Sequence, residues 1–402
     1  MTSETGGSAV HRTALVASVN ACMFVFGIVL LLMGSLLPAL HVSSNRAGSL
    51  GSFPLIGILA ATVFIGPVLD KAGAKPALAA GLALIAAALA VMPALASFPA
   101  LAAAALIYGL GGGVLNTATN ALISSLNATG RGAALNLLGF SFSLGAISAP
   151  LLMSLLAGRF PPPTVLRILA IAPAAVLIAV VALRFPPPVL SGTPLRSLLR
   201  VLSHPMVWLI GLLLFFESGD ENCMFVWAAR TVREMLHLAA GRADLALVGL
   251  SVALGVGRLL AALWLDWLGS RNVLLLAAAV TITGVVVARS YETFGALIAG
   301  FAVIGLGMSA TFPTALGLVG DQFPSETGTV FGTVMTVALV GGSSGPVVGG
   351  WLASSDPARV LLVPVTAAAA IAILTLIVSH YGCGSTGSAA MLTADGSSRS
   401  LM

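Results

Sequence analysis

Charged residues are scarce in this chain. Of its 402 residues only 8% are charged, whereas 58% are hydrophobic and the mean hydropathy is +1.07. In a soluble globular domain about 25% of residues are charged, so the composition argues against that class and favours a protein that lies in a bilayer. The net charge of +5 is small, and we expect no nucleic acid as a partner.

Cysteine and histidine are scarce as well. Cys22, Cys223 and Cys383 are too few for a disulfide framework and lack metal-ligand spacing. The five histidines lie at the ends of apolar segments or between them, which argues against a metal site or a histidine proton relay inside a membrane. We therefore expect no metal and no cofactor. The sequence offers no nucleophile–base pair and no extramembrane domain, so we expect neither an enzyme nor a receptor.

Long apolar runs, by contrast, fill the chain. A helix needs about 20 apolar residues to cross the hydrocarbon core. Twelve segments satisfy this: 14–40, 48–69, 75–96, 99–126, 131–158, 163–185, 205–230, 241–265, 272–289, 293–319, 327–353 and 357–381. The sequence therefore predicts an all-α membrane protein with twelve transmembrane helices.

These helices divide into two sets of six. Residues 1–190 are expected to form an N-terminal bundle and 205–381 a C-terminal bundle, joined by a cytoplasmic linker at 191–204. The last stretch, 382–402, is rich in Gly and Ser, and we expect it to be a disordered cytoplasmic tail.

The two sets repeat each other at a spacing of about 196 residues. The repeated landmarks are Asp70 and Asp266, Gly73 and Gly269, Gly109-Leu-Gly111 and Gly305-Leu-Gly307, and Gly145 with Pro150 against Gly341 with Pro346. One register for all of them indicates two similar halves in parallel, the arrangement in which many secondary transporters build a central site between two gates.

Two short loops carry an acid, a glycine turn and a cation in sequence, once in each half. The carboxylate can accept hydrogen bonds from the start of a helix and pair with a cation, and glycine permits the turn. We expect these loops to lock the cytoplasmic helix ends while the outside is open; the simpler alternative is a solvated loop that fixes orientation. The residues expected to take part are Asp70, Lys75, Arg131, Asp266, Arg271 and Glu326. Since basic residues divide almost evenly between the two sides, cytoplasmic termini are inferred from these loops.

Three acids lie inside the segment 205–230. Glu217, Asp220 and Glu221 are spaced i, i+3, i+4, so they share one helix face. An ionised side chain at a helix centre costs about 2.5–3.5 kcal/mol on the insertion scale, so these groups must meet water, cations or protons. Glu221 is our first choice for a transported proton, and helix rise suggests that Arg258 reaches Glu217 more easily than Glu221. Alternatively, the acids reach an outer vestibule and Arg258 caps its own bundle.

Amides supply the other buried polar groups. Asn116 and Asn120 lie one turn apart in the segment 99–126, and Asn20 and Asn136 lie in two neighbouring segments. Amides suit hydroxylated ligands because they both donate and accept hydrogen bonds. We expect a ligand to be held by Asn20, Asn116 and Asn120 from one half and by Asn222 and Trp227 from the other. Asn136 is expected to join helices instead.

The repeated acid–glycine–cation loops, together with twelve spans in two halves, resemble the major facilitator superfamily. Leu115-Asn-Thr-Ala-Thr-Asn120, Gly219-x-Glu221-x5-Trp227 and Gly257-Arg258 are similar to stretches of its fucose–galactose–gluconate:proton symporter family. The resemblance implies the major facilitator fold and helices one, four, seven and ten around a central cavity. One departure is marked: that family carries a protonatable glutamate where this chain has Asn116.

Taken together, these patterns predict a secondary active transporter in a cell inner membrane. Its substrate is expected to be a small hydroxylated solute, a sugar, moved by alternating access with or without protons, and the protein is expected to be a monomer in the lipid bilayer. A multidrug or metabolite exporter is the alternative, with an apolar cavity lined by Phe225, Trp227, Trp208 and Phe312. A sugar uniporter is a further one, because the segments 14–40 and 99–126 contain no acid.

Overall fold

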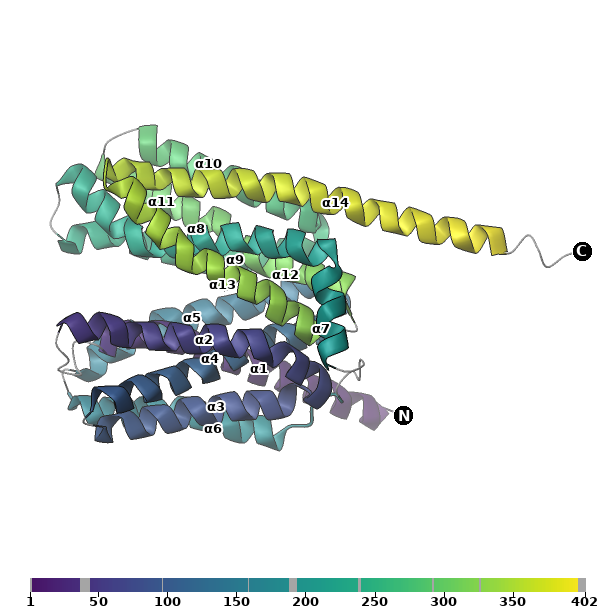
Figure 1. The fold of residues 1–402 in the computed structure, drawn as a ribbon, viewed down its shortest axis with the longest axis horizontal. Helices are drawn as coiled ribbons and strands as arrows, with labels where there is room; N and C mark the ends of the chain where they lie inside the picture. The colour runs from purple at the N-terminus through teal and green to yellow at the C-terminus, as the bar shows by residue number, and fades with distance from the viewer. Residues whose placement is uncertain are drawn as a thin grey trace, which may run out of the picture.

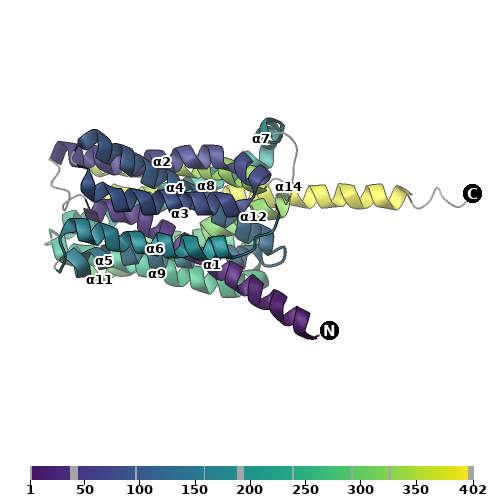
Figure 2. The ribbon, with the colours of Figure 1, turned by 90° about the horizontal axis from the view of Figure 1, so that it is seen from below.

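The computed structural model describes residues 2–36, 44–95, 97–157, 159–187, 194–237, 240–290, 293–324 and 327–396. Across these ranges the protein is built from α-helices with two short 3-10 turns, as the sequence predicts. Figure 1 shows two helical bundles side by side, one from each half of the chain, with α7 at the end where both termini lie. Figure 2 shows that most helices run along the same long axis.

The N-terminal bundle contains six long helices that match the predicted segments closely. They are α1 (Thr2–Leu36), α2 (Ser44–Ala72), α3 (Ala74–Val91, extended by the turn η2 at Met92–Ala94), α4 (Phe98–Leu126), α5 (Arg131–Ala157) and α6 (Pro162–Ala182). The short helix α7 (Pro194–Ser203) falls inside the predicted linker.

The C-terminal bundle repeats this plan with one span divided in two. Its helices are α8 (Pro205–Leu236), α9 (Ala240–Leu268), α10 (Ser270–Ser290), α11 (Phe294–Met308) with α12 (Thr311–Gln322), α13 (Thr327–Ala353) and α14 (Leu362–Gly396), the last preceded by the turn η3 (Pro357–Leu361). The helix α14 passes the predicted end at residue 381, so the structure differs from the expected disorder over 382–396. The stretch Ser388-Ala-Ala-Met-Leu contains good helix formers, whereas 397–402 lie outside the described residues.

Ten of these spans are long and apolar enough to cross a membrane by length and composition alone. The helices α5 and α8, with 27 and 32 residues, are long enough as well. Three acids lower the hydropathy of α8, which contains Glu217, Asp220 and Glu221. Side chains of both α5 and α8 line the cavity described below.

The repeat of about 196 residues is also visible in how the helices pack. A side chain at Gly109 would collide with the backbone of Pro54, and one at Gly305 would collide with the backbone of Leu250. Both pairs join equivalent helices of the two halves, and the partners are themselves one repeat apart. The glycines permit these close helix crossings, since small residues let two backbones approach inside a membrane.

The turns after Asp70 and Asp266 require glycine. Gly73, between α2 and α3, has φ 82°, and Gly269, between α9 and α10, has φ 75°. A side chain is disfavoured at positive φ, so these two positions fix the sharp turns that the sequence predicts.

The two bundles contact each other mainly through α2 against α13 and α5 against α9, and also through α12 against α5 and α13 against α4. Close glycines hold the first pair together, because a side chain at Gly66 would meet the backbone of Gly328. Between the bundles lies a cavity that is lined by α1, α4, α8 and α12 together with parts of α2, α5, α9 and α13.

Candidate functional site

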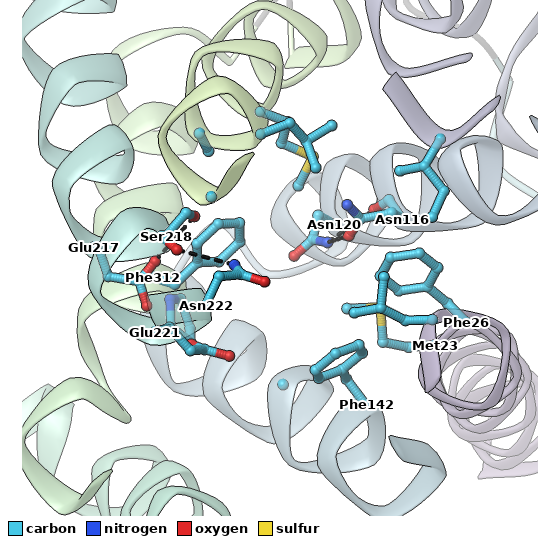
Figure 3. A pocket seen from close by; sticks show the side chains of 18 of the residues that line it. Met23, Phe26, Asn116, Asn120, Phe142, Glu217, Ser218, Glu221, Asn222 and Phe312 are labelled. Carbon is cyan, nitrogen blue, oxygen red and sulfur yellow. Dashed lines mark hydrogen bonds between the residues drawn. The ribbon is translucent and has the colours of Figure 1, made fainter. Parts of the chain in front are cut away.

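A cavity of about 400 Å³ lies between the two bundles and receives side chains from both (Figure 3). From the N-terminal half it is lined by Met23, Phe26, Leu30, Leu55, Ile58, Asn116, Asn120, Leu135, Gly139 and Phe142. From the C-terminal half it is lined by Glu217, Ser218, Glu221, Asn222, Val226, Arg258, Phe312, Pro313, Met335, Ala338, Leu339, Gly342, Ser343 and Pro346. This volume is at the lower end of small-molecule sites, about 300–1,000 Å³.

The polar groups of the N-terminal wall are two amides on α4. Asn120 Nδ2 donates to the carbonyl oxygen of Asn116 at 2.8 Å and to Asn116 Oδ1 at 3.3 Å. Both side chains are buried, and Figure 3 shows them together on one side of the cavity. The predicted pairing on one helix face is therefore present at the cavity wall.

The C-terminal wall is charged, and α8 supplies most of it. Glu217 is 1% exposed, and its Oε2 accepts a hydrogen bond from Ser218 Oγ at 3.2 Å. Its Oε1 has no hydrogen-bond partner among the described residues. Asn222 Nδ2 donates to the carbonyl oxygen of Ser218 at 2.9 Å. Glu217, Glu221 and Asn222 therefore reach the cavity from consecutive turns.

Arg258 on α9 forms the ion pair of this wall, with Glu221 rather than with Glu217. Its Nη2 lies 3.1 Å from Glu221 Oε2, and its guanidinium lies 5.6 Å from the centre of the Phe142 ring. The expectation that Arg258 reaches Glu217 more easily was wrong. It compared only the depths of the two residues along their own helices and could not include how α8 and α9 are placed beside each other. The side chain instead extends across the cavity toward α5, level with Glu221.

Three predicted residues do not line the cavity. Asn20 accepts a hydrogen bond from Ser141 Oγ at 2.8 Å and so joins α1 to α5. Trp227 donates through Nε1 to the carbonyl oxygen of Pro346 at 3.0 Å, which ties α8 to α13. Asp220 is 2% exposed, and its Oδ1 has no hydrogen-bond partner among the described residues. In this structure both Asn20 and Trp227 are used between helices, and their expected ligand contacts stay a prediction.

Sequence reasoning missed several residues that line the cavity and proposed others that do not line it. Of the four aromatic residues proposed for an apolar cavity only Phe312 lines it, whereas Phe26 and Phe142 were not singled out. An apolar residue in a membrane helix gives no sequence signal for facing a cavity rather than lipid. Ser143, one turn after Gly139, does not line the cavity but was also missed as a partner of Arg258, from which it receives a hydrogen bond.

At the end of the molecule near the termini, Asp70 closes the gap between the halves. It accepts hydrogen bonds from the backbone N–H of Gly328 at 2.9 Å and of Thr329 at 2.8 Å, and from the hydroxyl of Thr329. These groups belong to the first turn of α13, where a carboxylate is stabilised by unpaired N–H groups and the helix dipole. The partners lie in the opposite half, not in the neighbouring loop of the same half as predicted.

Arg131 makes a second contact between the halves at this end. Its Nη1 donates to Asp321 Oδ1 at 2.7 Å and to the carbonyl oxygen of Gly320 at 2.6 Å, both near the end of α12. Lys75 remains within its own half, where it donates to the carbonyl oxygens of Val181 and Leu183 at the end of α6. Arg271 is exposed at the start of α10. The side chain of Asp266 and the whole of Glu326 lie outside the described residues.

Comparison with known proteins decides the family. The sequence model of the Major Facilitator Superfamily matches residues 14–228 and again 210–382, once for each half. The chain belongs to the Major Facilitator Superfamily. It is therefore a multi-pass membrane transporter and not an enzyme.

Among solved structures of the superfamily, the fold is similar to the Escherichia coli fucose:proton symporter. The TM-score is 0.79 at 20% identity, covering 92% of this chain and 99% of that one. A proton:xylose symporter gives 0.74 at 13% identity, covering 93% and 96%. The human organic anion transporter of the same superfamily gives 0.70 at 17% identity, covering 91% and 99%. At these identities the similarity is one of fold.

A curated relative is named as a transporter of the same superfamily, but its name gives no substrate. An uncharacterized MFS-type transporter of Yersinia pestis is 26% identical over 163 residues, which are 40% of this chain and 42% of that protein. The aligned part thus spans less than half of the curated relative.

Proposed function

We propose that this transporter moves a small hydroxylated solute, a sugar, across a cell inner membrane by alternating access. The observation that carries the proposal is the pairing of Asn116 and Asn120 on one wall of the cavity with Asn222 on the other. Amides at both sides can donate to and accept from the hydroxyl groups of a neutral polar molecule. Apolar residues fill the rest of the wall, as expected for a site in which a few polar groups fix orientation.

The fold comparisons support this choice of substrate class. Two of the similar structures are symporters of fucose and of xylose with protons. Both are sugars, and this chain covers nearly their whole length. The sugar itself is left open by this proposal.

The contacts near the termini support the direction of gating. If both termini are cytoplasmic, Asp70 and Arg131 close the cytoplasmic side in this conformation. Turning inward then requires the hydrogen bonds that Asp70 accepts from Gly328 and Thr329, and the bond that Arg131 donates to Asp321, to break. Because these contacts join a whole helix end to the other half, they act together as a gate.

Proton coupling is proposed to use Glu217. Glu221 already has Arg258 as its ion-pair partner, whereas Glu217 is buried and its Oε1 accepts no hydrogen bond from the described residues. Unlike Asp220, Glu217 also lines the cavity. An incompletely compensated buried carboxylate is costly, so Glu217 gains from taking up a proton. If no acid couples, the protein is a uniporter.

Export of an amphipathic compound is a second candidate function, and the cavity lining favours it. Phe26, Phe142 and Phe312 line the cavity beside many aliphatic side chains. Aromatic and aliphatic walls of this kind suit a ligand with a larger apolar body.

A transport assay in proteoliposomes separates these possibilities. Labelled pentoses, hexoses and deoxyhexoses are compared with amphipathic amines, with and without an imposed proton gradient. Accumulation of a sugar with the gradient supports the proposal. Exchange of a sugar without accumulation indicates the uniporter, and gradient-driven movement of the amines alone would replace the sugar proposal by the exporter.

A further inference from the structure

Every nitrogen of the Arg258 guanidinium donates to the protein. Arginine carries five N–H groups and no acceptor. The Nε–H donates to the carbonyl oxygen of Ser309 at 3.4 Å, and Nη1 donates to the carbonyl oxygen of Gly139 at 3.3 Å and to Ser143 Oγ at 2.9 Å. Nη2 donates to Glu221, at 3.4 Å from Oε1 and 3.1 Å from Oε2.

Arg258 is the one cation that lines the cavity among the described residues. A planar guanidinium is well suited to bind a ligand carboxylate with two parallel bonds. Here Nη2 donates instead to a carboxylate of the protein on α8, and Nε and Nη1 donate to α5 and to the junction of α11 and α12. Arg258 is 4% exposed, so a solute meets little of its surface.

The groups of α8 that remain available in the cavity are mainly acceptors. Asn222 uses one amide hydrogen on Ser218, and its oxygen receives no hydrogen bond from the described residues. Figure 3 shows Glu221 and Asn222 reaching into the space opposite Asn116 and Asn120. The cavity also holds two carboxyl groups, those of Glu217 and Glu221, for one guanidinium. A solute is therefore favoured when it donates hydrogen bonds and carries no negative charge.

We propose that Glu221 is a built-in counter-anion that occupies Arg258, so that the cavity accepts neutral hydrogen-bond donors and rejects organic anions. This inference rests on the proposed function, because it concerns the same cavity, and it narrows the substrate class. Sugars are accepted, and the corresponding sugar acids are not. Removal of Glu221 should convert Arg258 into a carboxylate receptor.

Matched pairs of ligands test the selectivity in the wild-type protein. Galactose and galacturonate, or glucose and glucuronate, differ only in the group at C6. The thermal stability of the purified protein should rise with the neutral member of a pair and stay unchanged with the acid at equal ionic strength. Binding of an acid as tightly as its neutral partner would overturn the proposal.

A second measurement is independent of sugar binding. Glu221→Ala removes the carboxylate that accepts from Arg258 Nη2 and leaves a space about the size of that carboxylate. Acetate should then stabilise this variant in a saturable way, whereas chloride at the same ionic strength should not. The control is Glu234→Ala, which removes an acid at the far end of α8 that pairs with Arg230 and should gain no response to acetate.

Glu221→Gln covers the case in which the alanine variant does not fold. It keeps the volume and removes the negative charge, so it should bind galacturonate at least about tenfold more tightly than the wild type does, the scale of one charge-assisted hydrogen bond. If no neutral sugar binds but acetate stabilises Glu221→Ala, the sugar proposal fails and the role of Glu221 stands. If sugars bind and neither variant gains affinity for anions, the sugar proposal stands and the role of Glu221 is wrong.

Discussion

The two halves of this transporter share a fold but contribute different groups to their interface. At the cavity and at the closed end, one half supplies mainly charged side chains and the other mainly neutral groups. In the cavity, the N-terminal half supplies neutral amides, whereas the C-terminal half supplies two acids and an arginine. At the closed end the order is reversed. There Asp70 and Arg131 of the N-terminal half contact mainly backbone groups of the C-terminal half, those of Gly328, Thr329 and Gly320.

This difference teaches how a repeated fold acquires distinct functions in its two copies. The glycines that let helices cross recur in register, because both copies need the same packing. The two amides of the cavity wall do not recur: Asn116 and Asn120 of α4 correspond by the repeat to Phe312 and Leu316 of the α11–α12 span. Packing is thus common to the halves, whereas recognition and gating are divided between them.

The largest expected effect comes from the charged wall. Glu217→Gln should abolish accumulation of substrate under a proton gradient, because the amide can neither take up nor release a proton. Exchange of labelled for unlabelled substrate should continue, since the cavity keeps its shape. Both rates are measured in the same proteoliposomes.

The matched control for that variant is Glu234→Gln, on the same helix but outside the cavity. It should accumulate substrate like the wild type. If Glu217→Gln still accumulates substrate, Glu217 does not couple transport to protons. The difference in charge between the two cavity walls then does not explain coupling.

The neutral wall is tested by Asn120→Ala. Loss of one or two hydrogen bonds, each worth about 0.5–1.5 kcal/mol, should raise the KM for the transported sugar about tenfold with normal expression. Asn136→Ala is the control, because Asn136 is a buried amide of α5 that donates to Gly132 and does not line the cavity. An unchanged KM for Asn120→Ala would remove α4 from the binding site.

A smaller effect is expected at the closed end. Asp70→Asn removes a negative charge from the first turn of α13, which is worth about 0.3–1 kcal/mol from the helix dipole alone. The population open to the cytoplasm should increase several-fold. The measure is labelling of a cysteine introduced on the inner face of this end, in the wild-type and variant backgrounds.

Asp321→Asn provides the comparison for this gate. Its side chain is 54% exposed in the pair with Arg131, and exposed ion pairs contribute only about 0.2–1 kcal/mol. Labelling should therefore increase less than in Asp70→Asn. Equal labelling of Asp70→Asn and wild type would show that the contact with α13 does not hold the gate.

The smallest effect should come from Trp227→Phe. The variant loses the hydrogen bond to Pro346 but no cavity contact, so stability should fall by about 1 kcal/mol with the KM unchanged. Thermal unfolding and transport kinetics of the same preparation check both parts. A raised KM with unchanged stability would return Trp227 to the ligand site.

Most of the fold could be predicted from the sequence, because the bilayer limits the choice. Apolar runs of membrane length predict helices, and α4, α5 and α13 begin or end within a residue of the predicted segments. The glycine turns at Gly73 and Gly269 and the pair Asn116 and Asn120 follow from local spacing alone, since a helix face is determined by residue number.

The partners across the interface were decided only by the tertiary structure. Spacing along α8 places Glu217 and Glu221 on one face, but the choice of Glu221 by Arg258 depends on how far α9 lies from α5. In the same way, nothing local to Asp70 indicates that its partner is the first turn of α13, 258 residues away. Such contacts depend on how the two bundles dock. The free energy of that docking is distributed over many helix contacts, so no single sequence motif predicts it.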